Sequence, residues 1–208
     1  MLNQKHILLG YSGHAYVVLE EARRAGINVV AYAEFEKASK NPYKLEYAGF
    51  EGSDTFNAWQ KEYGFILGIG DNALRKKVAM KVLAKSEILD RVISPFSNIS
   101  ATATIGEGTF VNKGALINAL AEIKEGCIIN SGAIIEHECF IDAFTHIAPG
   151  AVLAGNVKVG KDVFIGANAV LREGIRIGDG ALIGAGSVVI KNVEAHTTLV
   201  GNPAIPIK

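Results

Sequence analysis

The sequence predicts a small Rossmann-like α/β domain followed by a parallel β-helix of hexapeptide repeats. A six-residue period over residues 93–194 predicts the β-helix. Apolar runs that alternate with two helical patterns over residues 6–86 predict the α/β domain. A short fixed period is typical of a fold built from stacked repeats, whereas strands alternating with helices are typical of a parallel sheet.

The six-residue period covers 17 consecutive hexads without an insertion. The first position is Ile, Val or Leu in every hexad, the fifth is small or β-branched, and the fourth is Gly, Asn or Asp in 12 of the 17. We expect the first and fifth positions to point inward and the fourth to lie at a corner, where these residues tolerate a positive φ. Three hexads form one triangular coil, so residues about 18 apart should stack on each other.

The residues before the repeat predict a βαβ unit. Residues 6–11 and 27–33 form apolar runs that we expect to be buried strands. Between them, a turn at residues 12–14 precedes helical spacing over 15–25, and Gly26 is a typical residue after a helix end.

A third strand and a second helix are expected further along. The third strand is residues 65–70, and the helix that follows is 71–86. Residues 46–50 suggest an edge strand, and residues 88–93 lead into the repeat. We therefore expect domains at 1–90 and 91–208, with residues 195–208 covering one end of the β-helix and the α/β domain the other, because open sheet edges promote aggregation.

Composition excludes several classes of protein. Lys plus Arg and Asp plus Glu both number 21, so no basic surface for nucleic acid is indicated. No apolar run reaches the roughly 18 residues needed to span a membrane, and no signal peptide is recognised, so we expect a cytoplasmic protein. Cys127 and Cys139 both occupy fifth positions on different faces of the coil. This predicts two small buried side chains without a disulfide.

The first turn invites comparison with a dinucleotide site. Residues 10–15, GYSGHA, carry two of the three glycines of that fingerprint. Because the motif is incomplete, we expect no NAD. Backbone N–H groups at a strand-to-helix turn suit a phosphate or a polar sugar, and Glu34 could accept a hydrogen bond from a ribose or base. The spacing alone is equally consistent with a tight turn that binds nothing.

The residues that break the repeat are the candidates for catalysis. Glu138 occupies a fourth position, His137 an outward third position and His146 a sixth position. Gly155 lies one coil above His137, close enough for its N–H to share a site with the imidazole. A histidine base with a neighbouring carboxylate and a backbone donor are the groups that acyl transfer requires.

Two alternatives remain for these residues. A corner histidine can be a solvated surface residue without a function. A catalytic zinc normally needs three protein ligands, and hexapeptide-repeat carbonic anhydrases bind zinc through three histidines. Of the five histidines, His6 and His14 precede the repeat and His196 follows it, so we expect no metal.

Several motifs give the chain a family resemblance. It resembles the bacterial nucleotide-sugar acetyltransferases of the sialic-acid O-acetyltransferase and UDP-4-amino-sugar N-acetyltransferase group, particularly those acting on the way to diacetylbacillosamine. The motifs are GYSGH at 10–14, GIGDN at 68–72 with RKK at 75–77, NSGAIIEHEC at 130–139, HIAPG at 146–150, AGN at 154–156 and GNPA at 201–204. Relatives often carry two acidic residues after the second strand, whereas Phe35 follows Glu34 here.

The resemblance implies a left-handed β-helix, although the general rule for crossovers favours the right hand. It also implies a homotrimer that binds acetyl-CoA between neighbouring β-helices. Three sets of residues are assigned by their matching motifs. They are His137, Glu138 and Gly155 for catalysis; His146, Gly155, Ala167 and Ala185 for acetyl-CoA; and Ser12, Gly13, His14, Glu34 and Gly70 for the nucleotide-sugar.

The expected reaction is N-acetylation of the 4-amino group of a UDP-linked 2-acetamido trideoxy sugar, with His137 as the general base. Within the enzyme class, a GDP- or dTDP-linked amino sugar or a sialic acid is the alternative acceptor. Outside that class, a non-catalytic trimeric scaffold is the alternative, because β-helices also serve as structural modules.

Overall fold

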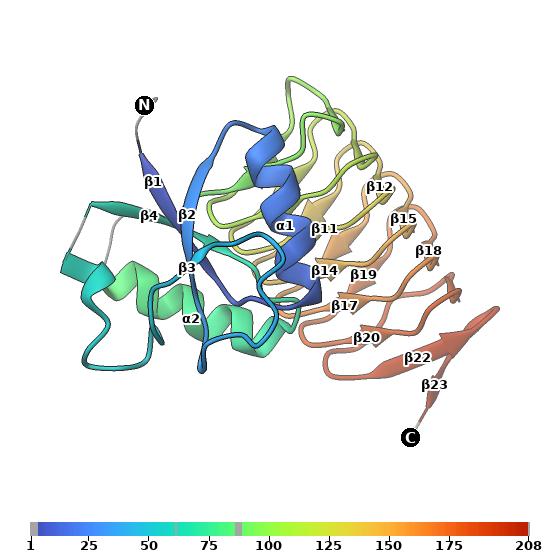
Figure 1. Ribbon diagram of the computed structural model, residues 1–208. Helices are drawn as coiled ribbons and strands as arrows, with labels where there is room; N and C mark the ends of the chain where they lie inside the picture. Colours follow the sequence, from blue (N-terminus) through green and yellow to red (C-terminus); the bar gives the residue numbers. More distant parts are fainter. Residues whose placement is uncertain (1–3, 61, 86–88, 208) are drawn as a thin grey trace.

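The computed structural model describes residues 4–60, 62–85 and 89–207 and shows an α/β domain beside a three-sided parallel β-helix (Figure 1). The expected end of the second helix at residue 86 and the expected start of the lead-in segment at 88 lie outside the described residues. None of the described helices is long and apolar enough to cross a membrane.

The α/β domain contains one parallel sheet with the strand order β3-β2-β1-β4. The predicted strands, helices and edge strand are present, but β1, β3 and β4 end earlier than predicted, at residues 9, 47 and 67, and the short helix η1 was not predicted. Helix α1 packs on one face of the sheet and α2 on the other. The elements are β1 (Lys5–Leu9), α1 (Gly13–Arg24), β2 (Asn28–Ala33), β3 (Glu46–Tyr47), η1 (Asn57–Gln60), β4 (Tyr63–Leu67) and α2 (Asn72–Lys85).

Helix α1 ends as its sequence predicts. Gly26 has a φ of +78°, and its N–H donates to the carbonyl of Arg23 at 3.1 Å. The N–H of Ile27 donates to the carbonyl of Ala22 at 2.9 Å. These two bonds satisfy carbonyls that the helix end leaves free, and glycine adopts the left-handed conformation without steric cost.

The β-helix has three parallel sheets, which we name the β5, β6 and β7 sheets after their first strands. Each strand pairs with the strand one coil later, as Ile128 pairs with His146. The β5 sheet contains β5 (Val92–Ile93), β8 (Phe110–Val111), β11 (Ile128–Ile129), β14 (His146–Ile147), β17 (Phe164–Ile165), β20 (Leu182–Ile183), β22 (Thr198–Gly201) and β23 (Ala204–Ile207). The β6 sheet contains β6 (Asn98–Ile99), β9 (Leu116–Ile117), β12 (Ile134–Ile135), β15 (Val152–Leu153), β18 (Val170–Leu171) and β21 (Val188–Val189). The β7 sheet contains β7 (Thr104–Ile105), β10 (Glu122–Ile123), β13 (Phe140–Ile141), β16 (Lys158–Val159) and β19 (Arg176–Ile177).

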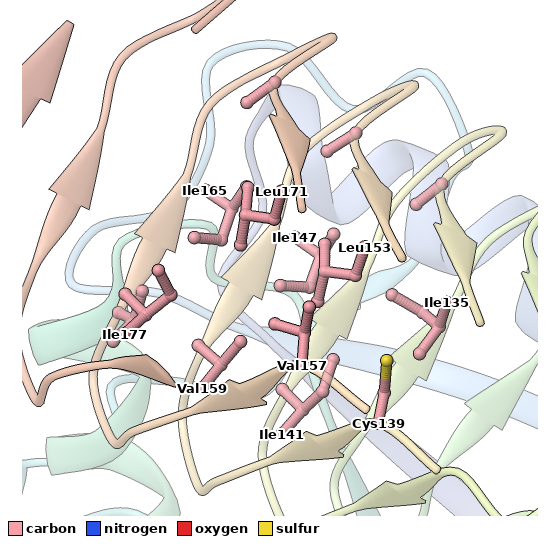
Figure 2. Packing of buried hydrophobic residues seen from close by; sticks show 14 of the residues in the cluster. Ile135, Cys139, Ile141, Ile147, Leu153, Val157, Val159, Ile165, Leu171 and Ile177 are labelled. Atoms are coloured by element: carbon pink, nitrogen blue, oxygen red, sulfur yellow. The ribbon is translucent and has the colours of Figure 1, made fainter. Parts of the chain in front are cut away.

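First-position and fifth-position side chains fill the interior of the coils, as predicted (Figure 2). Cys127 and Cys139 are buried free thiols in this core, and burial raises the pKa of Cys127 to about 12. Every fourth position from residue 108 to residue 186 has a positive φ, even where the residue is Leu120 or Phe144. The corner therefore imposes its conformation on residues that seldom adopt it.

The α/β domain lies against the side of the β-helix, so the prediction that it covers one end of the coils was wrong. Val92, Phe110 and Ile128 point outward from the β5 sheet and are buried in one cluster with Val18 and Leu19 of α1. Without the α/β domain, the outer face of the β5 sheet would form a large exposed apolar patch. Covering this face therefore explains the position of the domain. At the other end, the antiparallel strands β22 and β23 continue the same sheet, and Leu199 joins the core.

Arg75 of α2 joins the two parts of the chain. Its side chain is only 1% exposed. The guanidinium donates to the carbonyl of Gly126 at 2.7 Å, of Phe144 at 2.9 Å and of Gly70 at 3.0 Å, and to Oδ1 of Asn72 at 2.8 Å. One cation thereby satisfies carbonyls from two corners of the β-helix and from a loop of the α/β domain.

Replacing Arg75 with Met should lower the free energy of unfolding by roughly 3 kcal/mol or more, since each hydrogen bond from a charged donor contributes about 1.5–3 kcal/mol. Chemical denaturation at a fixed protein concentration measures the change. Lys77→Met, at an exposed position of the same helix, is the matched control and should change stability by less than about 0.5 kcal/mol. Equal stability of the two variants would contradict the proposed role of Arg75.

Candidate active site

His137 and Glu138 lie at the corner between β12 and β13, where the β6 sheet meets the β7 sheet. Nδ1 of His137 is 3.0 Å from Oε2 of Glu138. Because a carboxylate only accepts, the proton of the neutral ring is on Nδ1, and Nε2 of that form has a free lone pair. Both side chains are more than half exposed, which leaves Nε2 open to a substrate.

The backbone of this corner is held firmly. Glu138 has a φ of +58°, the left-handed conformation of the other fourth positions. Nζ of Lys158 donates to the carbonyl of Glu138 at 2.8 Å, and the N–H of Asn156 donates to the carbonyl of His137 at 2.8 Å. These bonds from the next coil fix the direction in which the imidazole leaves the corner.

Gly155 lies directly above His137 in the next coil, so the predicted stacking is confirmed. A Cβ added at Gly155 would lie 2.6 Å from Nε2 of His137, so any side chain there would force the His137 ring to move. Among the described residues, no carbonyl or side chain accepts a hydrogen bond from the Gly155 N–H. A reactive carbonyl oxygen could therefore bind this donor beside Nε2.

A second group of residues lies where β1 and β4 end. These neighbouring parallel strands place the turns at 10–14 and 68–72 side by side. A Cβ added at Gly70 would lie 3.6 Å from the His14 ring, and Ser12 and Gly13 are exposed beside it. Oε2 of Glu34 accepts a hydrogen bond from the N–H of Tyr11 at 2.9 Å, so this carboxylate stabilises the turn at residues 10–14.

His146 belongs to this second group and is buried on β14. Its ring lies 6.3 Å from the ring of His14 and packs edge-on against Phe164. Burial, reinforced by the positive charge of Arg75, lowers the pKa of His146 to about 3 and that of His14 to about 4. Both imidazoles are therefore neutral at physiological pH.

Ala167 and Ala185 stack at the corner between the β5 and β6 sheets. The N–H of Gly186 donates to the carbonyl of Ala167 at 2.8 Å, which links the two coils. Ala167 is partly exposed and Ala185 is exposed. Their small side chains leave the backbone of this corner accessible on the side of the β-helix that carries His146.

The candidate residues of one chain thus form two separate groups. His137, Glu138 and Gly155 occupy the corner between the β6 and β7 sheets, and this corner lies opposite the β5 sheet in a three-sided coil. His146 is on the β5 sheet, and the turns of the α/β domain lie against that same sheet. The fold does not bring the two groups together within one chain.

Sequence reasoning missed three residues. Val78, Ala79 and Val82 follow Arg75 at helical spacing. The sequence could therefore have placed Arg75 on the buried face of α2. Asn112 and Asn130 are 18 residues apart and stack, with Nδ2 of Asn112 donating to Oδ1 of Asn130 at 3.0 Å. Nδ2 of Asn130 in turn lies 3.2 Å from Nε2 of His146. Two asparagines one coil apart were the available signal.

The described residues contain no cluster of three or more His, Cys, Asp or Glu side chains suited to a metal ion. The chemistry that this geometry supports is proton abstraction by His137 beside a backbone hydrogen-bond donor.

Comparison with known proteins identifies relatives of both parts of the chain. Residues 5–82 match the PglD N-terminal domain, and residues 156–191 match the bacterial transferase hexapeptide repeats. A sequence comparison with curated proteins gives no match.

Solved structures match over nearly the whole chain. The acetyltransferase domain of PglB from Neisseria gonorrhoeae FA1090 is 30% identical with a TM-score of 0.90, covering 99% of this chain and 100% of that domain. The same domain has been solved in complex with acetyl coenzyme A, at 29% identity and a TM-score of 0.91 with the same coverage. PerB from Caulobacter crescentus, in complex with CoA and GDP-perosamine, is 32% identical with a TM-score of 0.92, covering 98% of this chain and 97% of PerB.

These matches confirm the predicted fold class, an α/β domain joined to a left-handed β-helix. They also confirm that the chain is an enzyme and an acyltransferase. The chain belongs to the family of acetyltransferases that carry a PglD N-terminal domain on a hexapeptide-repeat β-helix, as its motifs predicted.

Proposed function

We propose that the protein transfers the acetyl group of acetyl-CoA to the 4-amino group of a UDP-linked 2-acetamido trideoxy sugar. The observation that carries this proposal is the His137 imidazole, which is bound to Glu138 through Nδ1 and faces Gly155 with Nε2. The PglB domain in complex with acetyl coenzyme A and PerB in complex with CoA and GDP-perosamine support the acyl donor and the class of acceptor.

The reaction forms one N–C bond and breaks one C–S bond. The amine attacks the thioester carbonyl carbon, and Nε2 of His137 takes the proton that the nitrogen loses. Glu138 stabilises the resulting imidazolium. Negative charge develops on the carbonyl oxygen, where the Gly155 N–H donates a hydrogen bond, and such donors contribute roughly 3–4 kcal/mol. The tetrahedral intermediate then expels the CoA thiolate.

The complete site requires a second copy of the chain, and we propose a homotrimer. His146, Ala167 and Ala185 would contact acetyl-CoA, while Ser12, Gly13, His14, Glu34 and Gly70 would hold the nucleotide-sugar. These residues lie on the side of the β-helix away from His137. In a closed ring, His137 of one copy faces the β5 sheet side of its neighbour, and three equivalent sites result.

A GDP-linked amino sugar is the second candidate acceptor, because PerB was solved with GDP-perosamine. A panel of UDP-, GDP- and dTDP-linked amino sugars and free sialic acid, each incubated with acetyl-CoA, separates these candidates by release of free thiol. We expect the highest kcat/KM with the UDP-linked 4-amino sugar. If sialic acid is the one acceptor in the panel that gives thiol release, N-acetylation is disproved. If calorimetry shows no binding of acetyl-CoA, the protein is a scaffold.

Replacing His137 with Asn should lower kcat by about 10²–10⁴-fold, the usual contribution of a general base. Glu138→Gln should have a smaller effect, because the base itself remains. His196→Asn is the matched control, since His196 is another exposed corner histidine, and it should retain full activity. Near-complete kcat in the His137 variant would remove the assignment.

Gly155→Ala should reduce kcat at least about tenfold, because the new methyl group would displace the His137 ring and cover the N–H donor. Steady-state kinetics and thermal unfolding measure activity and folding separately. The double variant with His137→Asn should be slower than His137→Asn alone, because the N–H donor on the carbonyl oxygen acts in addition to the base. Equal rates of these two variants would show that Gly155 acts only through the position of the His137 ring.

Mixing two inactive variants tests whether the site is shared between copies. Gly13→Trp adds bulk to the proposed sugar site, and a Cβ there would meet nothing within 4 Å, so the fold should tolerate it. Unfolding and refolding this variant together with His137→Asn should restore about a quarter of the wild-type sites by random assembly into trimers. No recovery, in preparations whose trimeric state is verified by ultracentrifugation, would place the whole site in one chain.

A further inference from the structure

Two peptide planes flank Glu138, and together they set the direction of its side chain. The plane before Glu138 is held by the coils on either side of it. The carbonyl of His137 accepts a hydrogen bond from the N–H of Asn156 at 2.8 Å. The N–H of Glu138, in the same plane, donates to the carbonyl of Ala119 at 2.9 Å. With this plane fixed, the orientation of the plane after Glu138 decides its φ and ψ.

The plane between Glu138 and Cys139 lacks a backbone bond that the corner one coil below has. At that lower corner, the N–H of Ala121 donates to the carbonyl of Asn118 at 3.3 Å and closes the turn. In the described part of the chain, the N–H of Cys139 makes no such bond. Nζ of Lys158 instead donates to the carbonyl of Glu138 at 2.8 Å, so a side chain holds this second plane.

The conformation of Glu138 makes this bond important. Its φ of +58° is unfavourable for a residue with a Cβ, whereas the same corner carries Gly174 two coils later. No carboxylate among the described residues forms an ion pair with Lys158, although Lys124 beside the same sheet pairs with Glu122 at 3.1 Å. The ammonium group of Lys158 therefore bonds to the corner rather than to a neighbouring acid.

We infer that Lys158 is a positioning residue for the proposed general base. Its ammonium group holds the carbonyl of Glu138, and the held backbone keeps the carboxylate beside Nδ1 of His137. The carboxylate keeps the proton of the neutral ring on Nδ1, which leaves Nε2 free to take another proton. This inference rests on the proposed function, in which His137 accepts the proton of the attacking amine.

Nuclear magnetic resonance of the ¹⁵N-histidine-labelled, ligand-free protein tests the positioning without any substrate. The His137 signals are identified by their loss in His137→Asn. At a pH where the ring is neutral, the wild-type ring should carry its proton on Nδ1. In Lys158→Met, a larger fraction of the rings should carry the proton on Nε2. Lys124→Met is the matched control and should leave the signals unaltered. An identical His137 tautomer in Lys158→Met and wild type would overturn the inference.

Steady-state kinetics test the consequence for the reaction. Lys158→Met should lower kcat about three- to tenfold, the factor that one such hydrogen bond contributes, and should change the KM of either substrate by less than about twofold. Lys158→Arg keeps a cationic donor and should retain most of the kcat. A rise in the KM for acetyl-CoA with kcat unchanged would show that the ammonium group binds the cofactor, and the positioning role would be wrong.

A double-variant cycle with Glu138→Ala separates positioning from a general loss of structure. Once the carboxylate is absent, Lys158 has nothing to position, so adding Lys158→Met to Glu138→Ala should lower kcat by less than about twofold. A loss in this background as large as in the wild-type background would show that Lys158 acts elsewhere. Thermal unfolding of each variant checks folding separately.

The outcomes also separate this inference from the proposed function. If the wild-type protein transfers acetyl to no sugar of the panel, the proposed function fails, while the His137 tautomer still tests the hydrogen-bonded corner. If the wild-type protein is active and Lys158→Met changes neither the tautomer nor kcat, the inference fails and the proposed function stands.

Discussion

The constraint on which this structure depends is the uninterrupted register between coils. Each short strand donates to and accepts from strands one coil away, as Ile128 does with Phe110 and His146. A single inserted residue would move inward side chains to the outside for the rest of its coil. The same register places Gly155 above His137, so the geometry of the candidate site and the stability of the fold arise from one feature.

Arg75 links the α/β domain to the β-helix through hydrogen bonds. Its guanidinium binds carbonyls of two β-helix corners, at Gly126 and Phe144, and a carbonyl of the loop at Gly70. Its positive charge also disfavours protonation of His14 and His146, whose pKa values burial already lowers. A single buried cation thus fixes the α/β domain in place and helps keep the neighbouring imidazoles neutral.

Two histidines of the candidate site, His137 and His146, differ because their surroundings differ. His137 is exposed, and its Nδ1 bonds to a carboxylate, which leaves Nε2 able to take a proton. His146 is buried, its Nε2 lies 3.2 Å from Nδ2 of Asn130, and burial lowers the pKa of its ring to about 3. Identical side chains are therefore suited to different tasks, and their location on opposite sides of the coil explains why a shared site between copies is proposed.

The sequence by itself determined the coil, because its period repeats without interruption and each position in the hexad has one structural role. It also placed His137 beside Glu138 and below Gly155, since stacking follows from counting residues. Only the tertiary structure decided that the α/β domain covers the β5 sheet rather than the coil end, since no local pattern states which apolar faces will meet. It also decided the hydrogen bonds of Arg75, Asn112 and Asn130, because the partners of a buried polar side chain are distant in the sequence.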